Sequence, residues 1–349
     1  FEPFFMGVSD NLQEEINDKN VVYDEAAYRR NKPVDKLPLQ DKIVLDDIVY
    51  KYPNSEVLIF DHAHMEIPAG KSVGIVGTSG AGKTTIVDIM LGLLSIQEGH
   101  ILADGVEVRD HYESWLKNIG YIPQTIFMID STIRKNVAFG YADEDIDDAK
   151  VWEALKKARL DEFVRSLPEG LDTSIGERGI RISGGQRQRI GIARALAVEP
   201  SLIIADEPVS ALDVSIQAQV LNLLNELKHD LDLTYIFVAH DLSVVEYISD
   251  RVGVMYLGNF VEVGEKEKIY SNPMHPYTLS LLSAVPIPDP ETARHSKRIV
   301  LEGDVPSPLK MPTGCPFRTR CKYATEQCAK EMPPLSDRGS GHFVACWNK

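Results

Sequence analysis

Apolar runs and helical patterns follow one another along much of the chain. Runs typical of buried strands cover residues 72–76, 201–205 and 233–239. Apolar residues at helical spacing cover residues 84–91 and 214–228, and Asp213 is placed to cap the second of these helices. These patterns predict an α/β fold.

Other segments predict antiparallel strands. The dipeptide Asp104-Gly105 separates two apolar runs between residues 101 and 108, which is the strongest short signal for a β-hairpin. Residues 43–52 show partial alternation and predict a strand, and residues 251–264 show a further hairpin pattern. We therefore expect an N-terminal antiparallel β-subdomain beside the main sheet.

The remaining segments show other sequence patterns than the predicted strands and helices of the main sheet. Helical patterns at 136–139 and 149–164, ending in an amphipathic helix through Leu196, predict a helical subdomain over about residues 125–195. Residues 1–40 are polar and interrupted by prolines, which predicts a linker or tail. Prolines are frequent in residues 266–349, and we expect a separate appendage outside the sheet.

One glycine-rich segment carries the clearest chemistry. Residues 77–84, here called the phosphate loop, match the pattern G-x-x-x-x-G-K-[ST] between a predicted strand and a predicted helix. Backbone N–H groups of such a loop cradle phosphates, the lysine reaches the β- and γ-phosphates, and the hydroxyl that follows binds Mg²⁺. The alternative is a glycine turn with a solvated lysine. The predicted nucleotide-binding residues are Gly77, Thr78, Ser79, Gly80, Ala81, Gly82, Lys83, Thr84 and Thr85.

Polar side chains end two other predicted strands. Asp206 suits a Mg²⁺ contact. Glu207, the next residue and so on the opposite side of the pleat, suits polarising a water molecule. His240 follows the strand 233–239, at the end where such sheets place their ligands. The alternatives are a solvated acidic turn and a structural histidine.

Composition and charge narrow the class of protein. The chain has 349 residues and a formal net charge of −15, which argues against a general nucleic-acid-binding protein. It lacks an uninterrupted apolar run of about 18 residues and shows no signal-peptide pattern. No cysteine precedes Cys315, which indicates a reducing compartment.

Taken in order, the motifs of residues 41–265 resemble the nucleotide-binding domain of ATP-binding-cassette (ABC) transporters. Residues 77–84 correspond to its Walker A motif, 182–186 to its signature, 202–207 to its Walker B motif and 210–213 to its D-loop. Tyr52 corresponds to the adenine-stacking A-loop, Gln124 to the Q-loop and His240 to the switch histidine; a strand-end tyrosine could equally serve packing alone. The resemblance implies an α/β P-loop NTPase fold with a RecA-like core.

The resemblance also implies a mechanism, with ATP and Mg²⁺ as cofactors. Thr84, Gln124 and Asp206 would bind the metal ion, and Glu207, His240 and Gln124 would carry catalysis. Two domains would pack head to tail, so that ATP on one phosphate loop is capped by the partner domain. The residues implied for that cap are Ser183, Gly184, Gly185 and Gln186, and Asp213 of the D-loop is a further cofactor-binding residue that the resemblance implies. Transmembrane permease subunits would be further partners, with this chain peripheral at the cytoplasmic face of a bacterial inner membrane.

Two branches of the family are represented. Residues before about 195 resemble exporter-type ATPases at 130–137 and 176–179, and flippases for lipids or lipid-linked sugars are the nearest in kind. In that branch residues 1–40 would be the linker from a transmembrane domain. Residues from about 197 onward resemble the ATP-binding subunit of oligopeptide/dipeptide permeases, in the segments 205–220, 272–278 and 303–308. We infer a chimera with its seam near residues 190–196.

Three functions follow from these resemblances. Peptide import powered by ATP hydrolysis comes first, an exporter or flippase motor second, and an ABC ATPase without a membrane partner third. A kinase that uses the same loop would lack the signature at residues 182–186.

Four cysteines lie near the C-terminal end. Cys315, Cys321, Cys328 and Cys346 have the spacing C-x5-C-x6-C-x17-C, without the C-x2-C pairs of common zinc sites. The residues alone leave open an iron–sulfur cluster, a zinc ion, or plain or disulfide-bonded thiols. The permease resemblance implies a [4Fe–4S] cluster.

Overall fold

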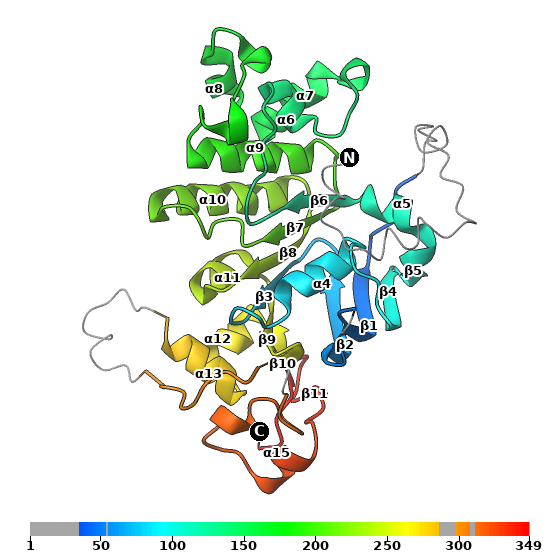
Figure 1. The fold of residues 1–349 in the computed structure, drawn as a ribbon, viewed down its shortest axis with the longest axis vertical. Coiled ribbons are helices and arrows are strands. Elements are labelled where there is room, and N and C mark those ends of the chain that lie inside the picture. Colours follow the sequence, from blue (N-terminus) through cyan, green and yellow to red (C-terminus); the bar gives the residue numbers. More distant parts are fainter. Residues whose placement is uncertain (1–34, 54, 286–297, 308–310, 349) are drawn as a thin grey trace.

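Two β-sheets organise the chain in the computed structural model, which describes residues 35–53, 55–285, 298–307 and 311–348 (Figure 1). The larger sheet has eight strands in the order β11-β12-β10-β9-β3-β8-β7-β6, and the smaller has the order β2-β1-β4-β5. The strands are β1 (Lys42–Lys51), β2 (Leu58–Pro68), β3 (Ser72–Val76), β4 (Glu98–Ala103), β5 (Val106–Glu107), β6 (Ile119–Ile122), β7 (Leu202–Asp206), β8 (Thr234–Ala239), β9 (Arg251–Tyr256), β10 (Asn259–Glu265), β11 (Ser336–Asp337) and β12 (Phe343–Val344).

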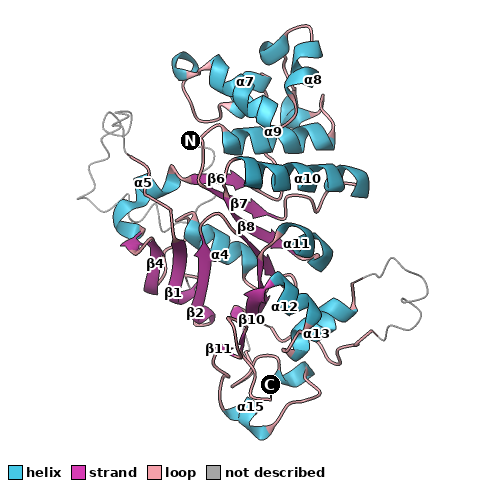
Figure 2. Cartoon of the chain, turned by 180° about the vertical axis from the view of Figure 1, so that it is seen from behind, coloured by secondary structure: helices cyan, strands magenta, loops and turns pink. Residues whose placement is uncertain are grey.

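Helices cover both faces of the larger sheet. The helices in the described residues, several of which lie away from the sheet, are α4 (Lys83–Met90), α5 (Tyr112–Leu116), α6 (Ile133–Val137), α7 (Asp148–Lys157), α8 (Asp161–Ser166), α9 (Gly184–Leu196), α10 (Val214–Asp230), α11 (Leu242–Ile248), α12 (Lys266–Ser271), α13 (Pro276–Ser283) and α15 (Glu326–Lys330). Helix α4 lies between the two sheets, whereas α10 and α11 lie on the other side of the larger sheet (Figures 1 and 2). Strands β6, β7, β8, β3 and β9 run parallel, and β10 runs antiparallel to β9.

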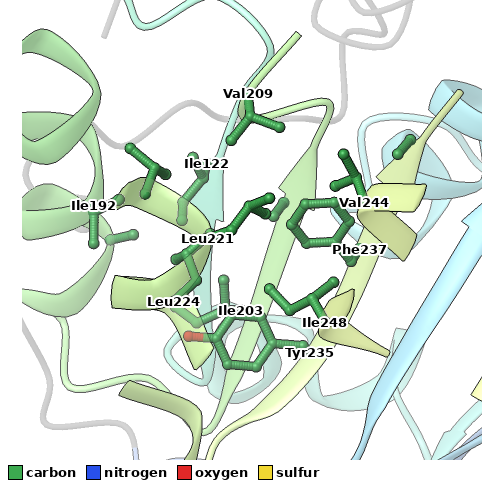
Figure 3. Close-up of a cluster of buried hydrophobic side chains, with 14 of the residues drawn as sticks. Ile122, Ile192, Ile203, Val209, Leu221, Leu224, Tyr235, Phe237, Val244 and Ile248 are labelled. Atoms are coloured by element: carbon green, nitrogen blue, oxygen red, sulfur yellow. The ribbon is translucent and has the colours of Figure 1, made fainter. Parts of the chain in front are cut away.

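Alternate residues of the buried strands divide between two cores. Ile203, Tyr235 and Phe237 pack with side chains of α10 and α11, including Leu221 and Ile248 (Figure 3). The intervening residues Leu202, Ile204, Ile236 and Val238 pack with α4 and the smaller sheet. The pleat therefore explains why these strands are apolar throughout, because neither of their faces meets water.

The smaller sheet confirms the predicted N-terminal antiparallel strands. Asp104 and Gly105 form the turn between β4 and β5 with φ angles of 48° and 80°, as an Asp-Gly hairpin requires. The Asp104 carboxylate also accepts hydrogen bonds from the backbone N–H groups of Gln40, Asp41 and Lys42, at 2.7, 2.9 and 3.0 Å. The turn thus fixes the chain where it enters β1. The predicted linker over residues 1–40 otherwise lies largely outside the described residues.

The helical segment differs from the sequence prediction in one place. A single helix was expected over residues 149–164, but α7 ends at Lys157 and α8 begins at Asp161. Arg159 has a φ angle of 55°, which no right-handed helix accommodates, so the chain breaks there without a glycine. In the part of the chain that the structure describes, no helix is long and apolar enough to span a membrane.

The C-terminal segment is not separate from the sheet, and that expectation is wrong. Strand β12 pairs with β10 through Glu262↔Val344 and Val263↔Phe343, and β11 pairs with β12. The segment therefore extends the edge of the larger sheet by two short strands. Helix α13 and the cysteine-containing loops lie beside this edge (Figure 1).

Candidate nucleotide site

The phosphate loop joins the carboxyl end of β3 to the start of α4, as the sequence predicts. Gly82 caps the helix with a φ angle of 100°, a conformation that glycine adopts without strain. At Gly77 an added Cβ would lie only 2.4 Å from the carbonyl oxygen of Met255, so no other residue fits there. The loop backbone is consequently held against β9.

Lys83 folds back over the loop. Its Nζ donates hydrogen bonds to the carbonyl oxygens of Gly77 at 2.8 Å and of Thr78 at 3.2 Å. Burial lowers the pKa of Lys83, and the carboxylates of Glu207 and Asp206 oppose that shift. The ammonium group is therefore held against the backbone of the loop, in the motif that binds phosphate.

Asp206 and Thr84 lie together. Burial raises the pKa of the Asp206 carboxyl and Glu207 raises it further, while a hydrogen bond from the Thr84 hydroxyl and the charge of Lys83 lower it. A carboxylate and a hydroxyl in contact supply oxygen ligands of the kind Mg²⁺ prefers. The residues predicted to bind the ion from Walker A and Walker B are therefore adjacent.

Glu207 is the meeting point of the predicted catalytic residues. One of its carboxylate oxygens, Oε2, accepts a hydrogen bond from Gln124 Nε2 at 3.1 Å and lies 3.0 Å from His240 Nδ1. The other, Oε1, lies 3.9 Å from Lys83 Nζ. Three residues from separate parts of the sequence thus converge on one carboxylate.

The orientation of Glu207 is not set by the pleat, contrary to the prediction. Strand β7 ends at Asp206, and Glu207 has a φ angle of 45° in the left-handed region. Its backbone N–H donates to the carbonyl oxygen of Val238, and its own carbonyl accepts from Ser210. A strained turn that is hydrogen-bonded on both sides therefore directs the carboxylate toward the phosphate loop.

Tyr52 lies at the end of β1, near the start of α4. Its hydroxyl is 2.9 Å from Thr85 Oγ1, and its ring meets the Tyr50 ring edge-on, with centroids 5.2 Å apart. The residue is 40% exposed, so part of its surface is accessible to a ligand. The link to Thr85 was not predicted, because only the fold brings these two hydroxyls together.

The signature residues are not brought to the phosphate loop. Ser183 caps α9, and its hydroxyl and backbone N–H form reciprocal hydrogen bonds with Gln186. Asp213 caps α10 as predicted, accepting from the N–H of Ile216 at 3.0 Å. In Figure 1 strands β6, β7 and β8 lie between α9 and α4. Ser183 and Gly184 are exposed.

Comparisons with known proteins agree with this arrangement. Residues 60–210 match the family described as "ABC transporter", and residues 261–328 match "Oligopeptide/dipeptide transporter, C-terminal region". An oligopeptide transport ATP-binding protein, OppF, of Haemophilus influenzae is 47% identical over 282 residues, which is 80% of this chain and 85% of that protein. This chain belongs to the family of ABC transporter ATP-binding proteins.

Further relatives align over most of the ABC chain. A putative peptide import ATP-binding protein of Brucella ovis is 45% identical over 304 residues, 85% of this chain and 94% of that protein. The oligopeptide transport ATP-binding protein AppF of Bacillus subtilis is 41% identical over 307 residues, 83% of this chain and 89% of that protein. An alignment of this length within 349 residues includes residues 190–196 wherever it begins. These relatives therefore match the chain on both sides of the inferred seam. The chimera stays a prediction.

A solved structure shares the fold. A bacterial Atm1-family ABC exporter with ATP bound matches with a TM-score of 0.63 and 30% sequence identity. The match covers 74% of this chain but only 44% of the exporter chain. The ABC ATPase fold is therefore shared with an exporter, while the C-terminal segment matches the oligopeptide/dipeptide transporter family.

Two contacts of the phosphate loop (the Walker A loop) could not be predicted from the sequence. Gly258, in the turn between β9 and β10, donates its N–H to the carbonyl oxygen of Ala81 at 2.8 Å. Tyr277, on α13, accepts a hydrogen bond from the N–H of Thr78 at 3.1 Å. His275-Pro276 signals the start of a helix at this point, but nothing local shows where the tyrosine hydroxyl points.

No disulfide joins the four described cysteines, and three of them are buried. Burial raises the pKa of the Cys315 thiol to about 11, and the neighbouring Cys328, Cys321 and Cys346 also raise it. Within the described ranges, no group of three or more histidine, cysteine, aspartate or glutamate side chains is arranged to hold a metal ion. The structure therefore gives no support to the [4Fe–4S] cluster that the resemblance implies.

Proposed function

We propose that this chain is the ATP-hydrolysing subunit of an ABC importer for oligopeptides or dipeptides. The observation that carries the proposal is the match of residues 261–328 to the oligopeptide/dipeptide transporter C-terminal region, joined to an ABC ATPase domain in one chain. The names of relatives that are 41–47% identical support the same substrate class.

The site geometry supports roles for individual residues. Lys83 would neutralise the β- and γ-phosphates, and Thr84 with Asp206 would hold Mg²⁺, which supplies charge neutralisation at the phosphates. Glu207 would polarise the attacking water, since its carboxylate lies within the same site and is held by Gln124 and His240. Tyr52 would stack on the adenine ring.

A second ABC domain would complete the site. The γ-phosphate cap cannot come from residues 183–186 of the same chain in this conformation, because α9 lies apart from α4 (Figure 1). We infer that these residues, together with Asp213, face the phosphate loop of a second copy or of a sibling subunit. The exposure of Ser183, Gly184 and Asp213 agrees with such an interface.

The remaining partners would be transmembrane permease subunits, with this chain bound at the cytoplasmic face of a bacterial inner membrane. We expect Gln124 and the helical segment that follows it to lie near the permease. The acidic net charge gives no support to a nucleic-acid partner.

An exporter-type motor is the second candidate. The likeness to the Atm1-family exporter favours it, at 30% identity over 74% of this chain. The C-terminal region argues for import, since its match is to peptide transporters. Direction of transport separates the two candidates.

An uptake assay tests the proposal. A strain of the source organism that lacks this chain would be complemented with the wild type or with Lys83→Ala, and entry of a labelled peptide would be measured. Wild type should restore uptake and K83A should not, while uptake of a free amino acid stays constant in both. Equal peptide uptake with and without the wild-type chain would overturn peptide import.

The cysteines carry a separate hypothesis, a [4Fe–4S] cluster in the C-terminal segment. The closeness of the other three thiols, which raise the pKa of Cys315, supports the cluster; the lack of a group of three or more ligands arranged to hold a metal among the described side chains opposes it. Iron and sulfide analysis of anaerobically purified protein decides whether the four cysteines hold a [4Fe–4S] cluster. Stoichiometric zinc, or neither metal, would remove the cluster.

A further inference from the structure

A tyrosine of the C-terminal segment reaches the Walker A loop. Tyr277 lies 199 residues from Thr78 in the sequence, yet its hydroxyl accepts a hydrogen bond from the Thr78 N–H at 3.1 Å. The same hydroxyl lies 3.4 Å from Thr78 Oγ1, to which it donates. Tyr277 is completely buried, so no solvent molecule competes at this position.

The contact acts on a single peptide unit. The N–H of Thr78 and the carbonyl of Gly77 belong to the same planar amide, and that carbonyl accepts from Lys83 Nζ at 2.8 Å. The amide is thus held by Tyr277 through its hydrogen and by Lys83 through its oxygen. Without the tyrosine hydroxyl, one of these two restraints on the plane of the amide is lost.

The position of Tyr277 is itself fixed by packing. Its ring centroid lies 4.7 Å from that of Tyr256 on β9 and 5.5 Å from that of Phe317, which follows Cys315 by two residues. Tyr256 and Phe317 also meet edge-on, with their centroids 5.2 Å apart. The three rings therefore form one buried contact between the sheet, α13 and the cysteine-containing segment.

Hydrogen bonds hold the backbone before Tyr277. The carboxylate of Glu262, which is completely buried on β10, accepts from the N–H groups of Met274 at 2.7 Å and His275 at 2.9 Å. His275 caps α13, with its Nδ1 accepting from the N–H of Tyr277. The hydroxyl at Thr78 is consequently placed by a rigid turn rather than by a mobile loop.

We propose that Tyr277 is a positioning residue for nucleotide binding, through which the C-terminal segment orients the Walker A loop. The inference rests on the proposed ATPase function. A loop whose amides already face the phosphates loses less conformational freedom when nucleotide binds, so its affinity is higher. The tyrosine contacts the loop at the N–H and hydroxyl of Thr78, and it takes no part in the hydrolysis step.

The test compares conservative variants in the whole chain. Tyr277→Phe removes only the hydroxyl and keeps the ring packing. Tyr235→Phe is the matched control. Tyr235 is also completely buried, and its hydroxyl has no hydrogen-bond partner among the described residues. The residue is paired with Ser72, at the end of β3 that is remote from the loop. Lys83→Ala reports whether the loop binds nucleotide at all.

ATP binding would be measured directly by calorimetry, and steady-state hydrolysis would give KM and kcat. We expect Y277F to bind ATP about threefold to tenfold more weakly, the loss typical of one neutral hydrogen bond, with KM raised and kcat unchanged. Y235F should match the wild type, and K83A should lose binding. Y277F should unfold at a slightly lower temperature than Y235F, because only Y277F loses a buried hydrogen bond.

The variants distinguish a failure of the positioning role from a failure of the nucleotide site. If Y277F binds ATP as tightly as the wild type while K83A does not bind, the positioning role is overturned and the ATPase proposal stands. If K83A binds ATP like the wild type, the nucleotide site itself is overturned, and the inference falls with it. A Y277F variant that loses kcat but keeps its ATP affinity would also contradict the positioning role.

Discussion

His240 Nδ1 lies 3.0 Å from Glu207 Oε2, and the two residues follow the neighbouring parallel strands β8 and β7. Gln124 donates to the same carboxylate oxygen from the loop after β6. Three adjacent strands thus bring three polar side chains to one point beside the Walker A loop.

Glu207→Gln should nearly stop ATP hydrolysis while leaving ATP binding intact. The amide keeps the shape of the side chain and one hydrogen-bond acceptor but is not a base, so kcat should fall by about two orders of magnitude or more. In the presence of ATP the variant should also accumulate as a dimer on size-exclusion chromatography. Unchanged phosphate release would remove the role given to Glu207.

His240→Ala should lower kcat more than ATP affinity. The imidazole lies 3.0 Å from the Glu207 carboxylate, and in the proposed mechanism it would also contact the γ-phosphate. Loss of such a preorganised group costs about a hundredfold in rate. His229→Ala is the control, because His229 is an exposed histidine in the last turn of α10. Equal kcat values for H240A and H229A would contradict the assignment.

Glu262→Gln should destabilise the C-terminal segment. The buried carboxylate accepts two backbone N–H groups and lies 2.7 Å from His342 Nε2, whereas a glutamine retains only one acceptor oxygen. We expect the free energy of unfolding to fall by about 1–3 kcal/mol in urea titrations. The exposed Glu267→Gln should change it by less than about 0.5 kcal/mol, and equal effects would show that the buried network is unimportant.

His275 should make stability depend on pH. Burial lowers its pKa from 6.5 to about 3, so the unfolded chain binds a proton in a pH range where the folded chain does not. The resulting stability is present above the unfolded pKa and is lost as the pH falls toward the folded pKa. Between about pH 7 and pH 5, wild type should lose about 2 kcal/mol more unfolding free energy than His275→Asn. Parallel pH curves for the two proteins would contradict this.

The sequence was sufficient for features with a local cause. The phosphate loop, which includes Gly82 and Lys83, lies within eight consecutive residues, so its motif can be recognised in the sequence. The Asp104-Gly105 turn is equally local. Buried strands such as β7 and β8 could be predicted because both of their faces are apolar. The helix cap at Asp213 follows from the residue type alone.

Other features depend on contacts that no short window contains. Arg159 and Glu207 take left-handed conformations without glycine, because the surrounding fold over-determines them. The pairing of β12 with β10 joins residues about eighty positions apart. The frequent prolines of the C-terminal segment therefore could not indicate this pairing. The hydroxyl of Tyr277 reaches Thr78 only after the sheet and α13 have packed.

Peptide-dependent ATP hydrolysis tests the central claim most directly. The chain would be reconstituted with its transmembrane partners in proteoliposomes, and phosphate release would be followed with and without transported peptide. We predict a rate that rises with peptide and that both Lys83→Ala and Glu207→Gln abolish. A rate that peptide leaves unchanged, or that survives in either variant, would contradict an ABC subunit that couples ATP hydrolysis to peptide import.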